Sequence, residues 1–356
     1  MTFSHDTLGQ RVVFGSGRAE QNLAAEIDRL GGRSVMVIVS SREQARAPRL
    51  VASVAAAHVY REFAPHVPVA TATAAREAAC QRGVDLLVSI GGGAATGLAK
   101  AVALDTSVPI IAVPTTYSGS EATNVWGITE ASRKTTGVDN RVLPAVVVYD
   151  AMLSRSLPLG ITVASGLNAV AHCVDSMWAP RGDPINQATA TDALRWLSGG
   201  LRAVHAEPDD LSARERMLFG AYLAAVAFAS AGSGLHHKIC HVLGGAYDLP
   251  HAATHAVVLP YVLAFNAPFA PDAAARIASA LGTDDATSGL ERLRSDLGAP
   301  LSLREIGMDE AAVDDAVERV LPVVPPSNPR PASREELHRL LAAAWSGAGP
   351  ASIVAR

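Results

Sequence analysis

Histidine is concentrated in one short segment of this chain. Five of the eleven histidines lie between His236 and His255, in the run HHKICHVLGGAYDLPHAATH. Histidine changes its charge near neutral pH and is also the commonest metal ligand in proteins. This concentration predicts a site for proton transfer or metal binding, because packing alone does not call for so many imidazoles.

Two helical pairs and one later histidine predict a single site. In each pair the polar residues are four positions apart, which places them on one face of a helix. The last histidine follows the second pair by ten residues, beyond the turn signal GGAYDLP, and can return to the same face. The predicted catalytic residues are Asn168 and His172, His237 and His241, and His251.

Four other residues of the histidine-rich segment have simpler interpretations. His236 is adjacent to His237 and must point to a different side of the helix. His255 fits a core position as well as a site, and Tyr247 is predicted to pack at a turn. Cys240 is expected to make the protein sensitive to thiol reagents without acting as a nucleophile.

A glycine-rich turn predicts a phosphate-binding site. Gly91, Gly92 and Gly93, followed by Ala94, come after the apolar run VDLLVSI and before a helical stretch. Glycines let the backbone approach a phosphate closely, and the helix that follows offers free N–H groups and the positive end of its dipole. We expect this turn to bind the pyrophosphate of a dinucleotide.

A hydroxyl-rich loop follows the next apolar run. It has the sequence PTTYSGSE and contains Thr115, Thr116 and Ser118. The carboxyl ends of parallel strands meet at one edge of a sheet, so this loop should converge with the glycine turn. Two converging polar loops predict a nucleotide site more firmly than the glycines do alone.

The first two predicted strands lack the usual dinucleotide-binding pattern. The first ends in FGSG in place of GxGxxG. The second ends at Ser40, followed by Ser41 and Arg42, where a carboxylate normally holds the 2′-hydroxyl of the adenosine ribose. A neutral serine beside an arginine also tolerates a 2′-phosphate. We therefore expect the protein to use either NADH or NADPH.

The elements that position these residues fall into two blocks. Residues 1–155 alternate β-branched runs with Ala-rich stretches of helical period, which is typical of βα units around a parallel sheet. This predicts a doubly wound α/β domain that binds the dinucleotide. Strands are expected at residues 11–17, 34–41, 58–64, 84–93, 108–116 and 143–150, and helices at 19–31, 43–57, 71–83 and 94–105.

The second block, residues 156–356, is predicted to be an all-helical catalytic domain. Its β-branched runs nearly vanish in favour of long Ala- and Leu-rich stretches. Gly- and Pro-containing segments, among them APRGDP and AGSG, mark the helix breaks. Helices are expected at residues 160–179, 187–204, 213–234 and 334–345.

The composition is that of a globular protein, with 49% hydrophobic and 18% charged residues. A net charge of -4 gives no reason to expect nucleic acid or an anionic membrane as a partner. No signal peptide or spanning helix is visible, so we expect a cytoplasmic location. The three cysteines do not form a disulfide framework, and Cys80 is expected to be buried.

Five segments carry a family resemblance: GGGAATGLAK, PTTYSGSEAT, SGLNAVAHCVD, HHKICHVLGGAYDLPHA and SNPRP. In this order and spacing they resemble the iron-containing alcohol dehydrogenase superfamily over essentially the whole chain. In detail they are similar to its maleylacetate reductase branch. The resemblance implies a two-domain fold like that of dehydroquinate synthase, and usually a homodimer.

The resemblance also implies a metal-ligand set, from which this chain departs. The ligands in metal-dependent members match Asn168, His172, His237 and His251, but the first ligand there is an aspartate. Asparagine offers only a neutral oxygen, which is a poor substitute for a carboxylate on a divalent cation. Gly97 likewise replaces an aspartate of the glycine turn. We therefore expect no tightly bound divalent metal.

The branch reduces maleylacetate to 3-oxoadipate with NADH or NADPH, which implies a small dianionic keto acid as substrate. We expect His241 or His251 to stabilise the oxyanion and donate the proton. His172 and His237 are expected to shape and charge the pocket. The lost carboxylate at Asn168 would leave it more positive, which favours a dianion.

Three other functions compete with this prediction. A metal-dependent alcohol or glycerol-type dehydrogenase is opposed by Asn168. A lyase related to dehydroquinate synthase should carry more Lys and Arg in its second domain to bind a phosphate. A non-catalytic nucleotide-binding protein would not need the histidine cluster.

Overall fold

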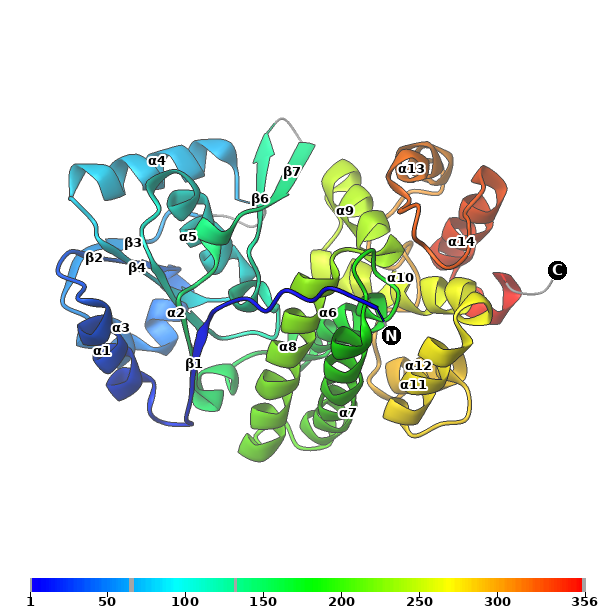
Figure 1. The fold of residues 1–356 in the computed structure, drawn as a ribbon, viewed down its shortest axis with the longest axis horizontal. Helices are drawn as coiled ribbons and strands as arrows, with labels where there is room; N and C mark the ends of the chain where they lie inside the picture. Colours follow the sequence, from blue (N-terminus) through cyan, green and yellow to red (C-terminus); the bar gives the residue numbers. More distant parts are fainter. Residues whose placement is uncertain (1, 64–66, 131–132, 354–356) are drawn as a thin grey trace. The chain divides into compact units, whose positions relative to one another are not determined.

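The computed structural model describes residues 2–63, 67–130 and 133–353. They form two compact units (Figure 1). The sheet unit comprises Leu8–Leu157 and Asp209–Leu218, and the helical unit comprises Met1–Thr7, Pro158–Pro208 and Phe219–Arg356. The N-terminal segment up to Thr7 therefore belongs to the helical unit, although the chain that follows it belongs to the sheet unit. Asp209–Leu218 belongs to the sheet unit, although the chain on either side belongs to the helical unit.

The sheet unit is built on six parallel strands in the order β1-β8-β5-β4-β2-β3. The four inner strands are runs of Val, Ile and Leu that are buried on both faces, as expected where helices cover a parallel sheet. The predicted doubly wound α/β fold is confirmed. The strands are β1 (Arg11–Phe14), β2 (Val35–Val39), β3 (Ala56–Tyr60), β4 (Leu86–Gly91), β5 (Ile110–Pro114) and β8 (Val146–Tyr149). The predicted end of the third strand, at Ala64, lies outside the described residues.

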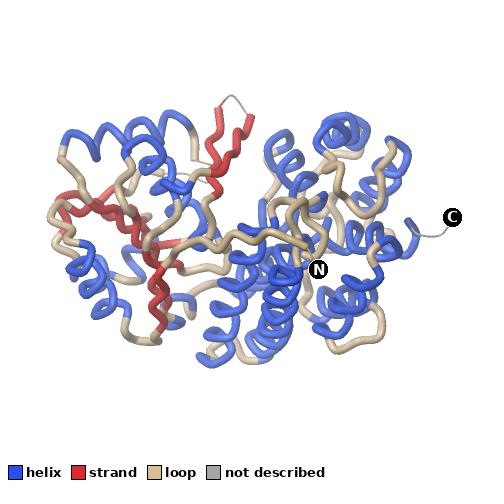
Figure 2. Tube along the Cα trace, viewed as in Figure 1, coloured by secondary structure: helices blue, strands red, loops and turns tan. Residues whose placement is uncertain are grey.

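Helices cover both faces of this sheet (Figure 2). Different helices cover the two faces, as alternate residues of β2 show. Met36 and Ile38 point to one face and pack with α4 and α5. Val35 and Val37 point to the other face and pack with α1 and α3. The helices are α1 (Ala19–Leu30), α2 (Ser41–Arg46), α3 (Pro48–Ser53), α4 (Val69–Gln81) and α5 (Gly93–Thr106).

Two features of the sheet unit differ from expectation. The single helix predicted at residues 43–57 is two short helices followed by β3, because Pro48 disfavours a helical conformation at Ala47. An antiparallel hairpin of β6 (Val125–Glu130) and β7 (Arg133–Val138) was not predicted. Its first strand is only half buried and lacks a continuous apolar run.

The helical unit consists of helices and loops in its described part, as predicted for the second block. Gly232, at a φ of 91°, ends α8 three residues before the predicted limit. The helices of the second block are α6 (Leu159–Ser176), α7 (Pro184–Ala206), α8 (Leu211–Ala231), α9 (Leu235–Tyr247), α10 (His251–Asn266), α11 (Pro271–Leu281), α12 (Ala286–Asp296), α13 (Ala312–Val320) and α14 (Arg334–Ser346). The start of α8, up to Leu218, is grouped with the sheet unit. Short 3-10 helices in the chain cover Ser120–Ala122, Asn140–Val142, Ala151–Ser154, Ala267–Phe269, Leu321–Val323 and Pro350–Ile353.

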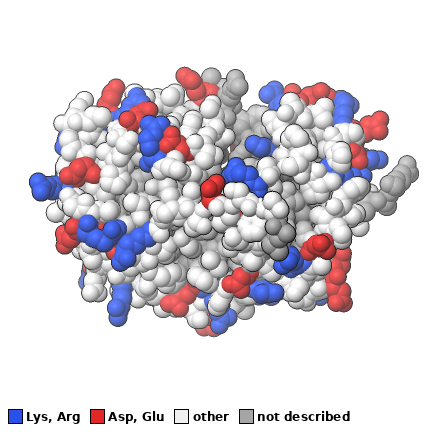
Figure 3. Space-filling view, in the orientation of Figure 1, with Lys and Arg blue, Asp and Glu red and all other residues white. Residues whose placement is uncertain are grey.

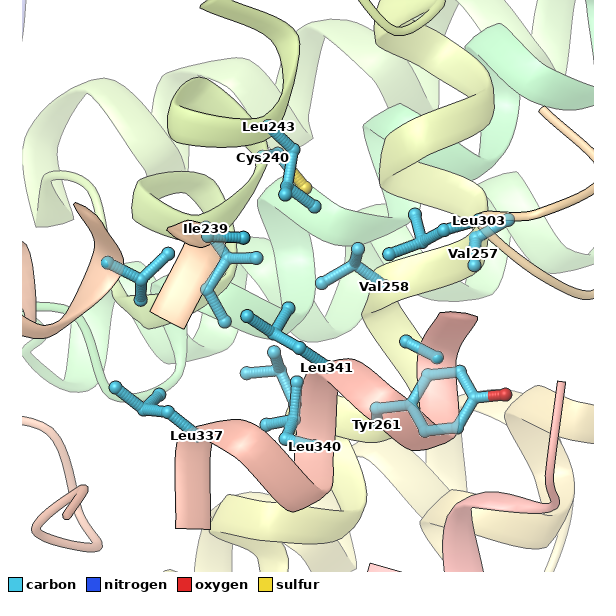
Figure 4. Packing of buried hydrophobic residues seen from close by; sticks show 14 of the residues in the cluster. Ile239, Cys240, Leu243, Val257, Val258, Tyr261, Leu303, Leu337, Leu340 and Leu341 are labelled. Carbon is cyan, nitrogen blue, oxygen red and sulfur yellow. The ribbon is translucent and has the colours of Figure 1, made fainter. Parts of the chain in front are cut away.

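One apolar core fixes the two helices that carry the histidine-rich segment. Ile239 and Leu243 of α9 pack with Val258 of α10 and with Leu337 and Leu341 of α14 (Figure 4). Tyr247 packs against the same cluster and donates a hydrogen bond to the Asp315 carboxylate, as expected of a packed tyrosine. This core therefore sets the positions of α9 and α10.

The cysteines are free thiols with different surroundings. Cys80 is exposed, so the expectation that it is buried was wrong. It lies in the last turn of α4. Cys240 is buried, and desolvation raises the pKa of its thiol well above the ordinary value. Burial and the raised pKa argue against the expected sensitivity of Cys240 to thiol reagents, because the reactive thiolate is both inaccessible and disfavoured.

Charges of both signs are scattered over the face shown in Figure 3. One helical stretch, His251–Phe269, is long and apolar enough to cross a membrane by composition alone. Within this stretch, 72% of the 18-residue segment that meets the test is buried inside the protein. This is the pattern of a core helix, and α10 indeed contributes Val257, Val258 and Tyr261 to the core described above.

Candidate functional site

The glycine turn joins β4 to α5 as a phosphate-binding turn requires. Gly91 has a φ of 147°, which favours glycine, and Gly92 begins α5 without any side-chain cap. The first amides of the helix therefore have no capping side chain of their own. A Cβ on Gly92 would lie 2.9 Å from Cγ2 of Thr116, so the absence of side chains lets the two loops meet.

The hydroxyl-rich loop meets this turn directly. The amide of Thr115 donates to the carbonyl oxygen of Gly91 at 3.1 Å. A Cβ on Gly93 would lie 3.4 Å from Oγ of Ser118. The structure thus brings together Gly91, Gly92, Gly93, Ala94, Thr115, Thr116 and Ser118, all of which the sequence assigned to coenzyme binding.

Ser40 lies at the end of β2, where its hydroxyl accepts a hydrogen bond from the amide of Glu43 at 3.1 Å and caps α2. Glu43 was not predicted from the sequence to lie at this site. Its Cγ lies 3.8 Å from the position of a Cβ on Gly91, and its carboxylate pairs with Arg46 at 3.0 Å. A carboxylate is therefore present beside the turn, one helical turn beyond the position where the sequence analysis looked for it.

Lys100 is a second residue that the sequence analysis left without a role. It is buried, and its Nζ donates to the carbonyl oxygens of Thr123 and Val125, both at 2.8 Å, and to Oγ1 of Thr123 at 3.0 Å. Burial lowers the pKa of Lys100 to about 7, opposed by the Glu121 carboxyl. Lys100 fixes the chain that follows the hydroxyl-rich loop to α5.

The histidine site is formed by α6, α9 and α10 of the helical unit. The ring of His172 stacks on that of His237, with centroids 5.0 Å apart and planes 13° from parallel. The ring centroid of His255 lies 4.9 Å from that of His237, and the ring centroid of His251 lies 4.4 Å from that of His255. His241 is 6.2 Å from His237 by ring centroids. Five histidines predicted or considered from the sequence thus lie in one cluster.

These residues differ in their exposure. His172 and His237 are buried, and Asn168 is buried one helical turn before His172. His241 is half buried, whereas His251, the first residue of α10, is exposed. Only His241 and His251 among these five residues are therefore accessible to a ligand without a rearrangement.

Burial keeps the enclosed imidazoles neutral. Desolvation lowers the pKa of His172 to about 4, and holds that of His237 well below its ordinary value. The neighbouring histidines and Lys238 depress the pKa of His237 further. Burial argues against the expectation that His172 and His237 charge the pocket, because a buried imidazole loses its proton when desolvation is not offset.

Asp175 belongs to this cluster and was missed in the sequence. It is fully buried on α6, and its Oδ2 accepts a hydrogen bond from Nδ1 of His237 at 2.7 Å. Burial raises the pKa of the Asp175 carboxyl, opposed by His236 and by three backbone amides. Its position three residues after His172, as the one carboxylate of α6, was the available signal.

His236 is buried in the core, and its ring meets that of His237 edge to face, with centroids 5.1 Å apart. Its Nε2 lies 2.9 Å from Nδ1 of His255, and Sγ of Cys240 lies 3.7 Å from the same nitrogen. The ligand atoms of these three residues lie within 4.8 Å of one another. The 2.9 Å between the two ring nitrogens is a hydrogen-bond distance, so His236 and His255 contact each other directly.

Four residues correspond to the metal ligands of the superfamily that this chain resembles. They lack the carboxylate of that ligand set. His172, His237 and His251 supply imidazoles, but Asn168 supplies a neutral amide in place of a carboxylate. No anionic side chain is present among these four residues to offset a divalent charge. The amide at Asn168 makes this donor set weaker for a divalent metal than one with a carboxylate, and we assign no reaction step to a metal.

Comparisons with known proteins extend over the whole chain. The family model for iron-containing alcohol dehydrogenase matches residues 9–151, and that for the C-terminal part of the Fe-containing alcohol dehydrogenase family matches residues 162–345. A maleylacetate reductase from Burkholderia cepacia is 43% identical over 346 residues, covering 96% of this chain and 97% of that protein. One from Sphingobium indicum is 43% identical, covering 98% and 99%.

Solved structures of related proteins also match nearly the whole chain. An iron-containing alcohol dehydrogenase from Corynebacterium glutamicum superposes with a TM-score of 0.97 at 53% identity, covering 99% of both chains. A maleylacetate reductase from Rhizobium sp. superposes with a TM-score of 0.92 at 41% identity, covering 98% of this chain and 100% of the other.

Proposed function

Because the chain belongs to the iron-containing alcohol dehydrogenase family, we propose that it is an NAD(P)H-dependent oxidoreductase that reduces maleylacetate to 3-oxoadipate. The observation that carries this proposal is the end-to-end match to maleylacetate reductases, at 43% identity over 96% of the chain in one case. The neutral Asn168, at a position where alcohol dehydrogenases of the family use a carboxylate, supports the same choice.

The reaction adds a hydride and a proton across a carbon–carbon double bond. The hydride passes from C4 of the reduced nicotinamide to the alkene carbon β to the ketone, and the electron pair of the alkene moves onto the ketone oxygen as an enolate. Proton transfer to carbon completes 3-oxoadipate and leaves the oxidised coenzyme. An enolate is less basic than an alkoxide, so a hydrogen-bond donor suffices to stabilise it.

We propose His241 or His251 as that donor. Both are accessible, whereas His172 and His237 are buried and neutral, and a neutral imidazole carries only one N–H. His172 and His237 then shape the pocket rather than charge it. Half-buried Lys238, whose charge acts on His237, is the cation that favours a dianionic substrate.

For the coenzyme, we propose the glycine turn and the hydroxyl-rich loop as the pyrophosphate site, with Ser40 near the adenosine ribose. The uncapped start of α5 supplies N–H groups for the phosphates. Both NADH and NADPH are expected to be used. A preference for NADH greater than roughly a thousandfold in kcat/KM, about 4 kcal/mol, would contradict this expectation.

A homodimer in the cytoplasm is also proposed. The edge strand β1 carries Val12 and Phe14, which are 37% and 41% exposed. Its outer edge can pair with a second copy, which would cover these side chains. Sedimentation of the purified protein at several concentrations tests this assembly, and a single monomeric species would contradict it.

The activity is tested by following NADH oxidation with freshly generated maleylacetate. Glycerol with the oxidised coenzyme and simple aldehydes with NADH serve as parallel substrates. Turnover confined to maleylacetate supports the proposal. Turnover of the alcohol or the aldehydes, with none of maleylacetate, would instead identify an alcohol dehydrogenase of the same family.

A further inference from the structure

We propose that Asp175 is a positioning residue that fixes the tautomer and orientation of His237, and that Gly234 is a glycine because the Asp175 carboxylate occupies the space of a side chain there. The hydrogen bonding is independent of the reaction. The effect on turnover rests on the proposed reduction of maleylacetate.

Three N–H groups converge on Oδ2 of Asp175. It accepts from the amide of Gly234 at 2.9 Å, from the amide of His237 at 3.4 Å and from Nδ1 of His237 at 2.7 Å. A carboxylate only accepts hydrogen bonds, so the hydrogen of the His237 ring must be on Nδ1. In the neutral ring Nε2 is then bare, and it has no hydrogen-bond partner among the described residues.

Gly234 makes this arrangement possible. A Cβ at Gly234 would lie 2.3 Å from Oδ1 and 2.7 Å from Cγ of Asp175, well inside contact distance. Gly234 also begins α9 and has no side chain with which to cap it. The carboxylate on α6 therefore replaces the missing cap of a helix of 13 residues and, with the same oxygen, holds the imidazole two residues into that helix.

The ring of His237 has little freedom under these constraints. It is stacked on His172 and lies 4.3 Å from the ring of Phe228 by centroids. A bare Nε2 accepts a hydrogen bond and does not donate one. His237 can therefore order an enclosed donor, such as a buried water molecule or a neighbouring side chain, and it does not protonate the substrate itself.

The test compares Asp175→Asn with the unmodified enzyme by nitrogen-15 NMR of the histidine rings, with the His237 signals assigned from a His237→Phe variant. The wild type should show hydrogen on Nδ1 of His237. An amide oxygen can still accept these N–H groups but carries no negative charge, so the preference for hydrogen on Nδ1 should weaken and the fraction of rings with hydrogen on Nε2 should rise. In turnover, kcat should fall roughly 10- to 100-fold while KM for NADH stays within about twofold.

A matched control is Asp183→Asn. Asp183 also caps a helix, α7, by accepting from the amides of Ile185 and Asn186, and it also accepts from a histidine, His5, at 2.8 Å. Its loss removes the same kinds of bond away from the histidine site, so kcat should be unchanged. A purely structural role for Asp175 would make the two variants behave alike.

A double-mutant cycle separates the two roles further. If Asp175 acts through His237, Asp175→Asn should cost little additional kcat in the His237→Phe enzyme. Additive losses or a bare Nδ1 in the wild type would each overturn the proposal. The wild-type spectrum decides the question even when Asp175→Asn does not fold. Absence of any turnover of maleylacetate by the wild type would reject the proposed function but leave the tautomer assignment standing.

Discussion

The imidazole rings of His172 and His237 are stacked 5.0 Å apart and nearly parallel, although the residues are on different helices and 65 positions apart in the sequence. Two parallel imidazolium rings at this distance would repel each other. The contact therefore agrees with the lowered pKa values that burial gives both residues. The centre of the site is a pair of neutral rings, and its accessible histidines lie at the margin.

The stability of the protein should fall as the pH is lowered from about 6.5 to about 4. The pKa of His172 is about 4 in the folded chain and about 6.5 in an unfolded chain. Between these values the unfolded state binds a proton that the folded state does not, so the stability present above pH 6.5 is progressively lost. Urea unfolding at about pH 7 and about pH 5 measures the loss, which should be smaller in His172→Phe. Equal losses in the two proteins would contradict this assignment.

Replacing His251 by alanine should lower kcat roughly 10²- to 10⁴-fold, as expected for the loss of a general acid. The dissociation constant of NADH should change much less, because the residues proposed to bind the coenzyme belong to the sheet unit. Stopped-flow turnover and fluorescence titration measure the two quantities. His338→Ala, which removes an exposed histidine of α14, is the control. Unchanged turnover in His251→Ala would leave His241 as the donor.

Replacing Asn168 by aspartate should create a metal site. The change restores a carboxylate one helical turn before His172, and binding of a divalent cation should tighten at least about tenfold. Metal content after dialysis, measured by mass spectrometry, tests this gain. The unmodified enzyme should keep its activity in a strong chelator. Activity that is lost to the chelator and restored by one metal would show that Asn168 does not prevent metal binding.

Gly92→Ala should weaken coenzyme binding roughly 10- to 100-fold, because the new methyl group would lie 2.9 Å from Cγ2 of Thr116 and force the two loops apart. Thr116→Ser removes that methyl carbon and should restore part of the affinity in the double variant. The KM values of NADH for the two single variants and the double variant provide the measurement. A double variant no better than Gly92→Ala would show that another contact causes the loss.

The sheet was predictable because its inner strands are buried on both faces, which leaves continuous runs such as VMVIV and IIAVP. The β6–β7 hairpin was not, since half-exposed residues such as Trp126 and Thr129 alternate weakly and Gly137 interrupts the second strand. Pro48 was a visible signal for the break between α2 and α3.

The histidine positions followed from their spacing of four on helices, but their charge did not. Local sequence gives no measure of burial, and burial decides whether an imidazole keeps its proton. Asp175 was missed because its partners, Gly234 and His237, are on another helix. Glu43 was missed because only the fold places the first turn of α2 beside Gly91.

The cap of α9 has a consequence for how the enzyme folds. The amide of Gly234 is bonded to a carboxylate 59 positions earlier in the chain. An isolated α9 peptide lacks this partner and should be poorly helical, since short helices in water are marginal without capping and packing. The first turn of α9 can therefore become stable only after α6 has docked. The histidine cluster should appear late and all at once during folding, so a partly folded chain will contain its imidazoles but not the site.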